Sequence, residues 1–137
     1  LRVPGTPMGD IFIWNDEETA RHLVFDPAMR AARLAAQPSD EEADILVRNK
    51  FSFAKLAWHP RLFNPDLQKW LHRIQVPTQV IWGDHDGLFP LAYAQHWHQQ
   101  LPGSGLHIVP DCGHSPINEK PAETAALIHA FMARDAA

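Results

Sequence analysis

Two side chains suited to proton transfer follow two short apolar runs in the second half of the chain. Asp86 comes after residues 79–82, and His114 comes after residues 106–109. An imidazole, with a pKa of about 6.5, can accept a proton from a hydroxyl nucleophile and return it to a leaving group. A carboxylate on its other ring nitrogen fixes the tautomer and stabilises the imidazolium. The pair predicts an acid–base couple in which Asp86 lies within hydrogen-bond reach of His114 Nδ1.

The two apolar runs have the length of strands and are separated by one helix. Pro90 begins this helix, which we expect to end near Gln100, before Leu101-Pro102-Gly103. A strand, a helix and a second strand form a unit with parallel strands, and the working loops of such units lie at the carboxyl ends of the strands. We therefore expect Asp86 and His114 at the same edge of one sheet.

The segments on either side of this unit read as helices. Asn15, Asp26, Ser39 and Asn64 are capping residues that predict helices over about 16–25, 27–36, 40–58 and 65–72. We expect Leu67, Trp70 and Leu71 of the fourth helix to point inward. Pro121 opens a last helix whose apolar face should lie on the sheet. That face comprises Ala125, Leu127, Ile128, Phe131 and Met132.

The two loops together resemble the C-terminal signature of the α/β-hydrolase superfamily. The residues that carry the resemblance are W-G-D-H-D-G-L-F-P at 82–90 and C-G-H-S-P at 112–116, with His114 28 residues after Asp86. The resemblance implies that Asp86 is the acid and His114 the base of a nucleophile–His–acid triad. It also implies an α/β class, a partial α/β-hydrolase fold in which a helical cap precedes the last two parallel strands. Residues 1–73 would be the cap region with its leading loop, and residues 74–137 the end of the core.

The nucleophile of such a triad is missing from this sequence. In the family it stands at the centre of G-x-S-x-G, before the acid and the histidine. Only two glycine pairs have this spacing, and their centres are Pro7 and His85. No His-Gly-Gly-type segment for an oxyanion hole is present either. Since the chain also begins with Leu1, we expect it to be the C-terminal portion of a longer enzyme.

Two functions from different classes stay open. In the first, the parent protein cleaves an ester, or a related acyl, C–C or epoxide bond, in a small and fairly apolar molecule. In the second, the chain is a truncated, catalytically inactive hydrolase-like fragment or an interaction domain. Apolar residues near the couple could line a substrate pocket or could equally be core. These residues are Leu88, Phe89, Ile117 and Trp58.

Other reactive residues fit structural roles better. Asp84 is the alternative acid, while His85 reads as an exposed loop residue. Cys112 lies two residues before His114 on the same loop, whereas triad partners normally come from separate loops, so we expect a small packed residue. His96 and His98 lie on different faces of one helix. We expect no metal ligands and no cofactor.

Composition narrows the possible partners. The 137 residues carry a net charge of −4, which provides no basic footprint for nucleic acid or an anionic membrane. No apolar run approaches the roughly 20 residues of a membrane span, and a single cysteine is compatible with the cytoplasm. A sheet of two strands leaves an open edge, and such edges pair with other chains. We expect this edge to dock with the missing N-terminal half or to mediate self-association.

Overall fold

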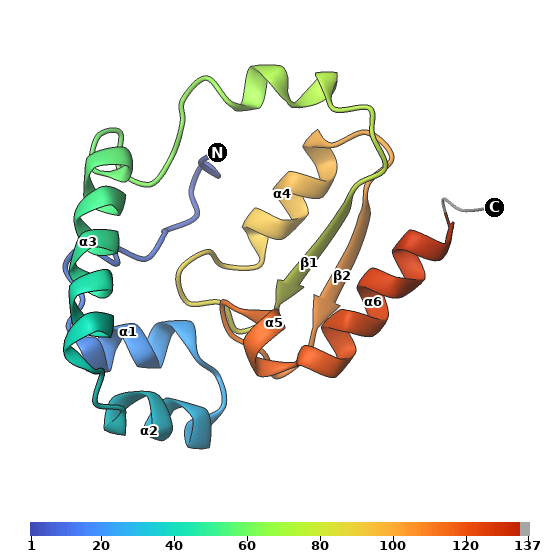
Figure 1. The fold of residues 1–137 in the computed structure, drawn as a ribbon. Coiled ribbons are helices and arrows are strands. Elements are labelled where there is room, and N and C mark those ends of the chain that lie inside the picture. Colours follow the sequence, from blue (N-terminus) through green and yellow to red (C-terminus); the bar gives the residue numbers. More distant parts are fainter. Residues whose placement is uncertain (135–137) are drawn as a thin grey trace.

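A computed structural model describes residues 1–134, and its centre is a two-stranded parallel sheet (Figure 1). Strand β1 (Gln79–Gly83) pairs with β2 (Gly105–Val109), with Val80 beside Leu106 in the register. Helix α4 (Ala92–Gln100) connects the two strands. The βαβ unit predicted from the sequence is confirmed, and both strands end at the same edge of the sheet.

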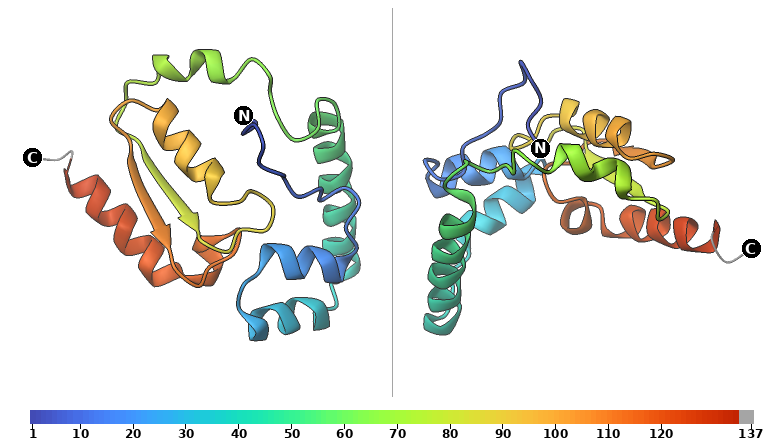
Figure 2. Two further views of the ribbon diagram at one scale, coloured as in Figure 1. Left: turned by 180° about the vertical axis from the view of Figure 1, so that it is seen from behind. Right: turned by 90° about the horizontal axis from the view of Figure 1, so that it is seen from above.

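Helices cover the two faces of this sheet. Figure 2 shows α4 on one face and α6 (Pro121–Arg134) on the other. Between β2 and α6 lies a short helix, α5 (Pro116–Glu119), which the sequence analysis did not predict. The core under α4 is a cluster of buried residues from four parts of the chain. Its members are Leu1, Leu71, Val80, Ala94 and Leu101.

The first part of the chain forms three capped helices, α1 (Asp16–Leu23), α2 (Pro27–Ala35) and α3 (Asp40–Ala57). Asn15 and Ser39 each form a capping box with the glutamate three residues later, and the Asp26 carboxylate accepts from two backbone N–H groups of α2. These side chains satisfy donors that a helix start leaves free. The three predicted helices are therefore confirmed, with ends that differ by one or two residues.

The fourth predicted helix is wrong in type, and of the three residues expected to point inward, Leu67 and Leu71 pack in the core while Trp70 does not. Residues Gln68–Arg73 form a 3₁₀ helix, η1, and not an α-helix over 65–72. Asn64 does accept a hydrogen bond, from Asp66 N at 2.8 Å, but this closes a local turn before η1 begins. Leu71 is buried as expected, whereas Trp70 points outward and is half exposed. The 3₁₀ geometry, with three residues per turn, separates these neighbours onto different sides.

Several apolar faces lack a covering element in the described part of the chain. No residue of α3 is buried, and Figure 2 shows this helix projecting away from the layer of the sheet. On α6, the predicted sheet-facing residues Ile128 and Met132 are exposed, as is Ile108 of β2. A sheet of two strands is too narrow to cover a fourteen-residue helix. Among the described helices, none combines the length and apolar character that a bilayer crossing needs.

Candidate active site

Asp86 and His114 meet at the carboxyl edge of the sheet. His114 Nδ1 lies 2.9 Å from Asp86 Oδ2, so the predicted contact is confirmed. The Asp86 side chain is almost completely buried, whereas 36% of the His114 side chain is exposed. A donor at Nδ1 facing a buried carboxylate fixes the imidazole tautomer and leaves Nε2 free to accept a proton. The contact therefore orients the imidazole and leaves Nε2 directed away from Asp86.

Backbone donors hold the Asp86 carboxylate in place. Its Oδ1 accepts hydrogen bonds from Leu88 N and Phe89 N, both at 2.9 Å, while Oδ2 faces His114. The two oxygens thus have separate tasks, one closing the loop 86–89 and the other orienting the imidazole. Hydrogen bonds from N–H groups stabilise the charged form of a carboxylate. The loop that carries Asp86 is built around the acid itself.

The two strand-end loops are packed directly on each other. Asp84 N donates to Val109 O at 3.1 Å, and His85 N donates to Cys112 O at 2.9 Å, which extends the pairing beyond the strands. A Cβ atom on Gly83 would collide with the carbonyl oxygens of Cys112 and Gly113. Only glycine fits here, because two backbones approach where a side chain would stand. This packing brings Asp86 and His114 together.

Asp84, the alternative acid, has different partners. Its Oδ1 lies 2.6 Å from His85 Nδ1 and accepts from Cys112 N at 3.2 Å. Burial alone would raise the pKa of Asp84, but the hydrogen bonds from His85 and Cys112 outweigh it and lower that pKa. Within residues 1–134, the hydrogen bonds of Asp84 do not include His114. Asp86 therefore occupies the position that orients the imidazole.

Cys112 is a packed residue, as the sequence analysis expected. Its side chain is fully buried, and burial raises the pKa of the thiol to about 11. The nucleophilic form of cysteine is the thiolate, so a neutral buried thiol is a poor nucleophile at ordinary pH.

Across the described residues, no group of three or more His, Cys, Asp or Glu side chains is arranged to hold a metal ion.

Residues 22–26, which comprise the end of α1 and the turn after it, contact both loops of the couple. Gly87 N donates to His22 O at 3.0 Å, and His114 N donates to Leu23 O at 2.8 Å. Further along, Phe25 N and Asp26 N donate to the carboxylate of Glu119. The sequence analysis missed these contacts. Gly87 and Gly113 were the available signal, because a glycine beside each functional residue indicates a close backbone approach.

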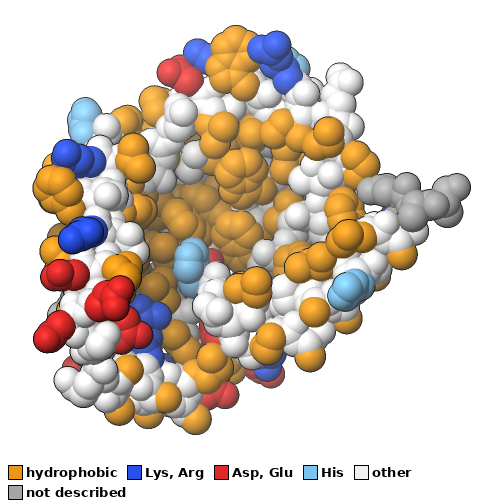
Figure 3. All heavy atoms as spheres, viewed as in Figure 1, with side chains coloured by type: hydrophobic (Ala, Val, Ile, Leu, Met, Phe, Trp, Pro, Cys, Tyr) orange, Lys and Arg blue, Asp and Glu red, His pale blue; other side chains and the backbone are white. Residues whose placement is uncertain are grey.

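An apolar cavity of about 630 Å³ opens beside His114. The space-filling view shows a hollow with hydrophobic side chains between α3 and the sheet (Figure 3). Leu88 and Phe89 line this cavity together with His114, and Phe53, Leu56 and Ala57 of α3 also contribute. Other lining residues are Ile11, Pro60, Leu62, Phe63 and Asn64. The structure thus brings two of the four predicted pocket residues to one cavity.

The other two predicted pocket residues, Trp58 and Ile117, are not among the residues that line this cavity. Trp58 is 55% exposed; it packs edge-on against Phe12 and carries the Arg61 guanidinium 4.2 Å from its ring centre. Ile117 is 65% exposed on α5. Ile117 is close to His114 in the sequence, and Trp58 lies in the expected cap region. The side chains of both nevertheless point away from this cavity.

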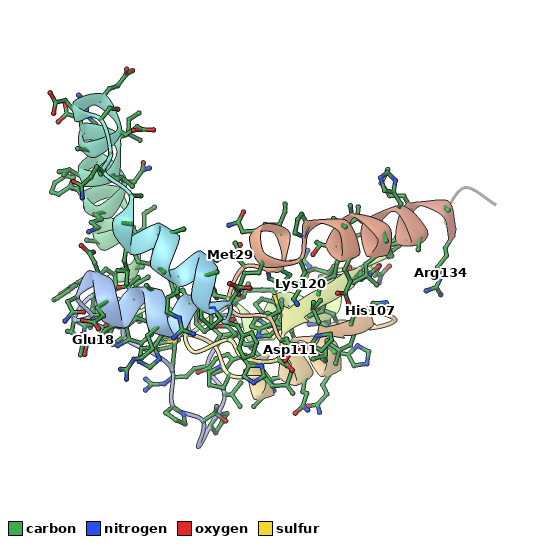
Figure 4. All side chains as sticks on the ribbon, turned by 90° about the horizontal axis from the view of Figure 1, so that it is seen from below. Glu18, Met29, His107, Asp111, Lys120 and Arg134 are labelled. Atoms are coloured by element: carbon green, nitrogen blue, oxygen red, sulfur yellow. The ribbon has the colours of Figure 1, made fainter. Side chains whose placement is uncertain are left out.

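His114 also borders a second cavity, of about 400 Å³. Residues of α2 and α5 are among those that line it, and Figure 4 labels Met29 on α2 and Lys120, the residue after α5. Its walls are more polar than those of the first cavity. They comprise Leu23, Val24, Met29, Arg33, Ser115, Asn118 and Glu119. The imidazole therefore stands between an apolar space and a mixed one.

Comparison with known proteins agrees with this geometry. Residues 49–121 match the family described as alpha/beta hydrolase fold. The chain is 36% identical over 67 residues to monoacylglycerol lipase ABHD6 of Mus musculus and 33% identical over 66 residues to monoacylglycerol lipase abhd6-A of Xenopus laevis. These matches cover 49% and 48% of this chain but 20% of each lipase. The chain therefore aligns with about a fifth of the length of these curated relatives.

Solved structures show the same fold over more of the chain. A serine hydrolase involved in carbazole degradation, the CarC enzyme, superposes with a TM-score of 0.61 at 23% identity, covering 91% of this chain and 50% of that one. A membrane phospholipase A superposes with a TM-score of 0.56 at 25% identity, covering 85% and 36%. With the family match and the paired strand-end loops, these similarities establish that the chain belongs to the alpha/beta hydrolase fold family.

Proposed function

We propose that this chain supplies the acid and the base of a hydrolytic triad, and that the nucleophile comes from a residue outside this sequence. The observation that carries the proposal is the contact of 2.9 Å between His114 Nδ1 and the buried Asp86 carboxylate. It is supported by the position of His114 at the wall of an apolar cavity. The substrate class that fits is a small, fairly apolar ester.

The proposed reaction uses the free nitrogen of His114. Nε2 takes the proton from a hydroxyl nucleophile as that oxygen attacks the ester carbonyl, and the Asp86 carboxylate stabilises the imidazolium. The ester C–O bond then breaks, and the same proton passes to the leaving alcohol. Water repeats the cycle on the acyl intermediate, giving the free acid and restoring the nucleophile. Asp86 stays ionised throughout and acts only on the orientation and charge of His114.

The lining of the first cavity supports an apolar acyl group. Leu88 and Phe89 come from the acid loop, and Phe53 and Leu56 come from α3, so the space is enclosed by the core on one side and a helix on the other. The names monoacylglycerol lipase and phospholipase A, carried by two of the similar proteins, support the same ester-cleaving class. We propose that residues 1–73 act as a cap over this space and residues 74–137 as part of the core.

The test is esterase activity in a polypeptide that joins this sequence to its upstream reading frame. With a short-chain p-nitrophenyl ester, Asp86→Asn should lower turnover by about 10⁴-fold, and His114→Ala should have at least that effect. Asp84→Asn is the matched control, because it removes a carboxylate from the same loop without touching His114. Full activity of His114→Ala would overturn the proposal, as would loss of activity in Asp84→Asn with Asp86→Asn unaffected.

The 137-residue chain alone should hydrolyse this ester at a background rate, because it contains no G-x-S-x-G segment. Turnover that His114→Ala abolishes would show that the nucleophile lies within the chain. We also propose that the exposed sheet edge pairs with the N-terminal part of the protein or with a second copy. A compact monomer with a cooperative melt, observed by size exclusion and calorimetry, would contradict this pairing.

A further inference from the structure

We infer that Glu119 is a positioning residue for His114. Glu119 is the last residue of α5, five positions after the imidazole, and its half-buried carboxylate accepts hydrogen bonds from backbone N–H groups of the His114 loop and of a segment more than ninety residues away. The inference rests on the proposed role of His114 as the base. It adds a residue that does not touch the substrate but determines where the base stands.

Three N–H groups converge on the two oxygens of this carboxylate. Oε1 accepts from Gly113 N at 2.9 Å, and Oε2 accepts from Phe25 N at 2.8 Å and from Asp26 N at 3.2 Å. A carboxylate suits this task because it offers only acceptors, and charge-assisted hydrogen bonds are stronger than neutral ones. An amide in the same place has a single acceptor oxygen, and its NH₂ group would face an N–H.

These hydrogen bonds act on His114 by two routes. The first is direct, since Gly113 is the residue before His114 and its N–H is held by Glu119 Oε1. The second runs through residues 22–26, where Leu23 O accepts from His114 N at 2.8 Å. Because the N–H groups of Phe25 and Asp26 donate to Glu119 Oε2, the carboxylate also fixes residues 22–26, the segment that contains Leu23. Removing the Glu119 carboxylate would therefore release both Gly113 and the segment that accepts from His114 N.

The packing around Gly113 indicates that this arrangement is tight. A Cβ atom on Gly113 would lie 2.5 Å from Leu23 O and 2.6 Å from Glu119 Oε1. On the acid loop, a Cβ atom on Gly87 would lie 2.6 Å from His22 O. Both loops of the couple therefore press against residues 22–26, and Glu119 holds the far end of that segment. Residues 22–26, which lie within the proposed cap region, thus form part of the support of the base.

The test is nuclear magnetic resonance of the histidine side chains in the 137-residue chain. Proton–nitrogen correlations report which ring nitrogen of each imidazole carries the proton. In the unmodified chain, we expect His114 to carry its proton mainly on Nδ1 at neutral pH. Glu119→Ala should remove this preference, and Glu119→Gln should fall between the two. Exchange of the Gly113, Phe25 and Asp26 amide protons should accelerate at least tenfold.

Controls within the same chain separate positioning from general damage. Glu123→Gln makes the same charge change on an exposed residue of α6 and should leave the His114 signals unchanged. His98, whose Nδ1 lies 2.9 Å from Ser104 Oγ at the other end of α4, reports whether the fold is intact. If Glu119→Ala unfolds the chain, a shift of His114 but not His98 in Glu119→Gln supports the inference. Unchanged His114 signals in Glu119→Gln would overturn it.

These measurements do not depend on catalysis, so the two proposals can fail separately. Activity that survives His114→Ala would refute the triad and leave the spectroscopic role of Glu119 standing. In an active longer polypeptide, Glu119→Ala should lower kcat on the order of 10²-fold with little change in KM, because a displaced base impairs the chemical step more than binding. A change confined to KM would contradict a positioning role.

Discussion

The strand-end loops and helix α3 differ sharply in how the rest of the molecule holds them. In the loops, Asp86 and Cys112 are buried, and backbone carbonyls of His22 and Leu23 together with the Glu119 side chain of α5 accept hydrogen bonds from the turns. In α3, none of the eighteen residues is buried, and Leu56 is 86% exposed. The loops are specified by many long-range contacts, whereas α3 is held by its own backbone, by its capping box and by a few surface contacts such as the stacking of Phe53 on Phe12.

This difference indicates where rigidity lies in the proposed site. The acid and base stand on the tightly packed side, while one wall of the apolar cavity belongs to α3. Segments with few buried contacts open at lower free energy than packed ones. We therefore expect the couple to keep its geometry while the α3 wall adapts to the substrate or to a covering partner.

The largest expected effect breaks the packed side at Gly83. Gly83→Ala places a methyl group against the carbonyl oxygens of Cys112 and Gly113, which are backbone atoms that cannot turn away. We expect a loss of about 4 kcal/mol in the free energy of unfolding, at the upper end for overpacking substitutions. Urea denaturation followed by circular dichroism measures it.

The matched control for Gly83→Ala is Gly105→Ala in the neighbouring strand. A Cβ atom on Gly105 meets nothing within 4 Å. Gly105→Ala should leave the free energy of unfolding unchanged or raise it by up to about 1 kcal/mol, since alanine restricts the conformations of the unfolded chain. Equal losses in the two variants would show that the loops are not packed as described.

The second-largest expected effect is the difference in stability between replacing a leucine in the packed core and replacing one on α3. Leu71 is 2% exposed in the cluster with Val80 and Leu101, so Leu71→Ala should cost about 3 kcal/mol through lost burial and the resulting cavity. Leu56→Ala on α3 should change stability by less than about 0.5 kcal/mol, as for other exposed sites. The difference between the two midpoints in urea is the readout. A cost of several kcal/mol for Leu56→Ala would mean that a partner covers α3 in solution.

The smallest expected effect is the pH dependence of stability, which tests whether the Cys112 thiol is buried in the packed loop. Burial raises the pKa of Cys112 from 9.0 to about 11 in the folded chain. Stability from the neutral buried thiol is therefore complete below about pH 9 and is lost as pH rises toward about 11. Relative to Cys112→Ala, the unmodified chain should lose about 1 kcal/mol between pH 8 and pH 10. A difference that stays constant over this range would contradict burial of the thiol.

Much of the fold was predictable because its signals are local. The capping boxes at Asn15 and Ser39 mark helix starts through bonds to residues three positions away, and both helices form as predicted. After Pro77 the apolar residues change from a helical spacing to short runs of strand length, and this change predicted both strands of the sheet. The segment 65–72 failed because its single cap at Asn64 closes a turn, and α5 was missed because a helix of four residues has too little periodicity to detect.

The candidate site was predictable only where its residues follow strands directly. Asp86 and His114 could be paired because parallel strands bring their ends to one edge of a sheet. Trp58 and Ile117 were assigned to a pocket from proximity in the chain, and the directions of their side chains depend on packing that no local pattern encodes. Glu119 was not considered, since its partners Phe25 and Asp26 lie more than ninety residues away.

The sequence by itself determined most of the helices, the parallel pair of strands and the chemical identity of the couple, because capping, periodicity and strand order act over a few residues. Only the tertiary structure decided that Asp84 turns toward His85 and Cys112, that Leu88 and Phe89 border the apolar cavity, and that the Glu119 carboxylate joins the His114 loop to residues 25–26. These outcomes depend on the close approach of three backbone segments at Gly83, Gly87 and Gly113, where the absence of a side chain lets distant parts of the chain meet.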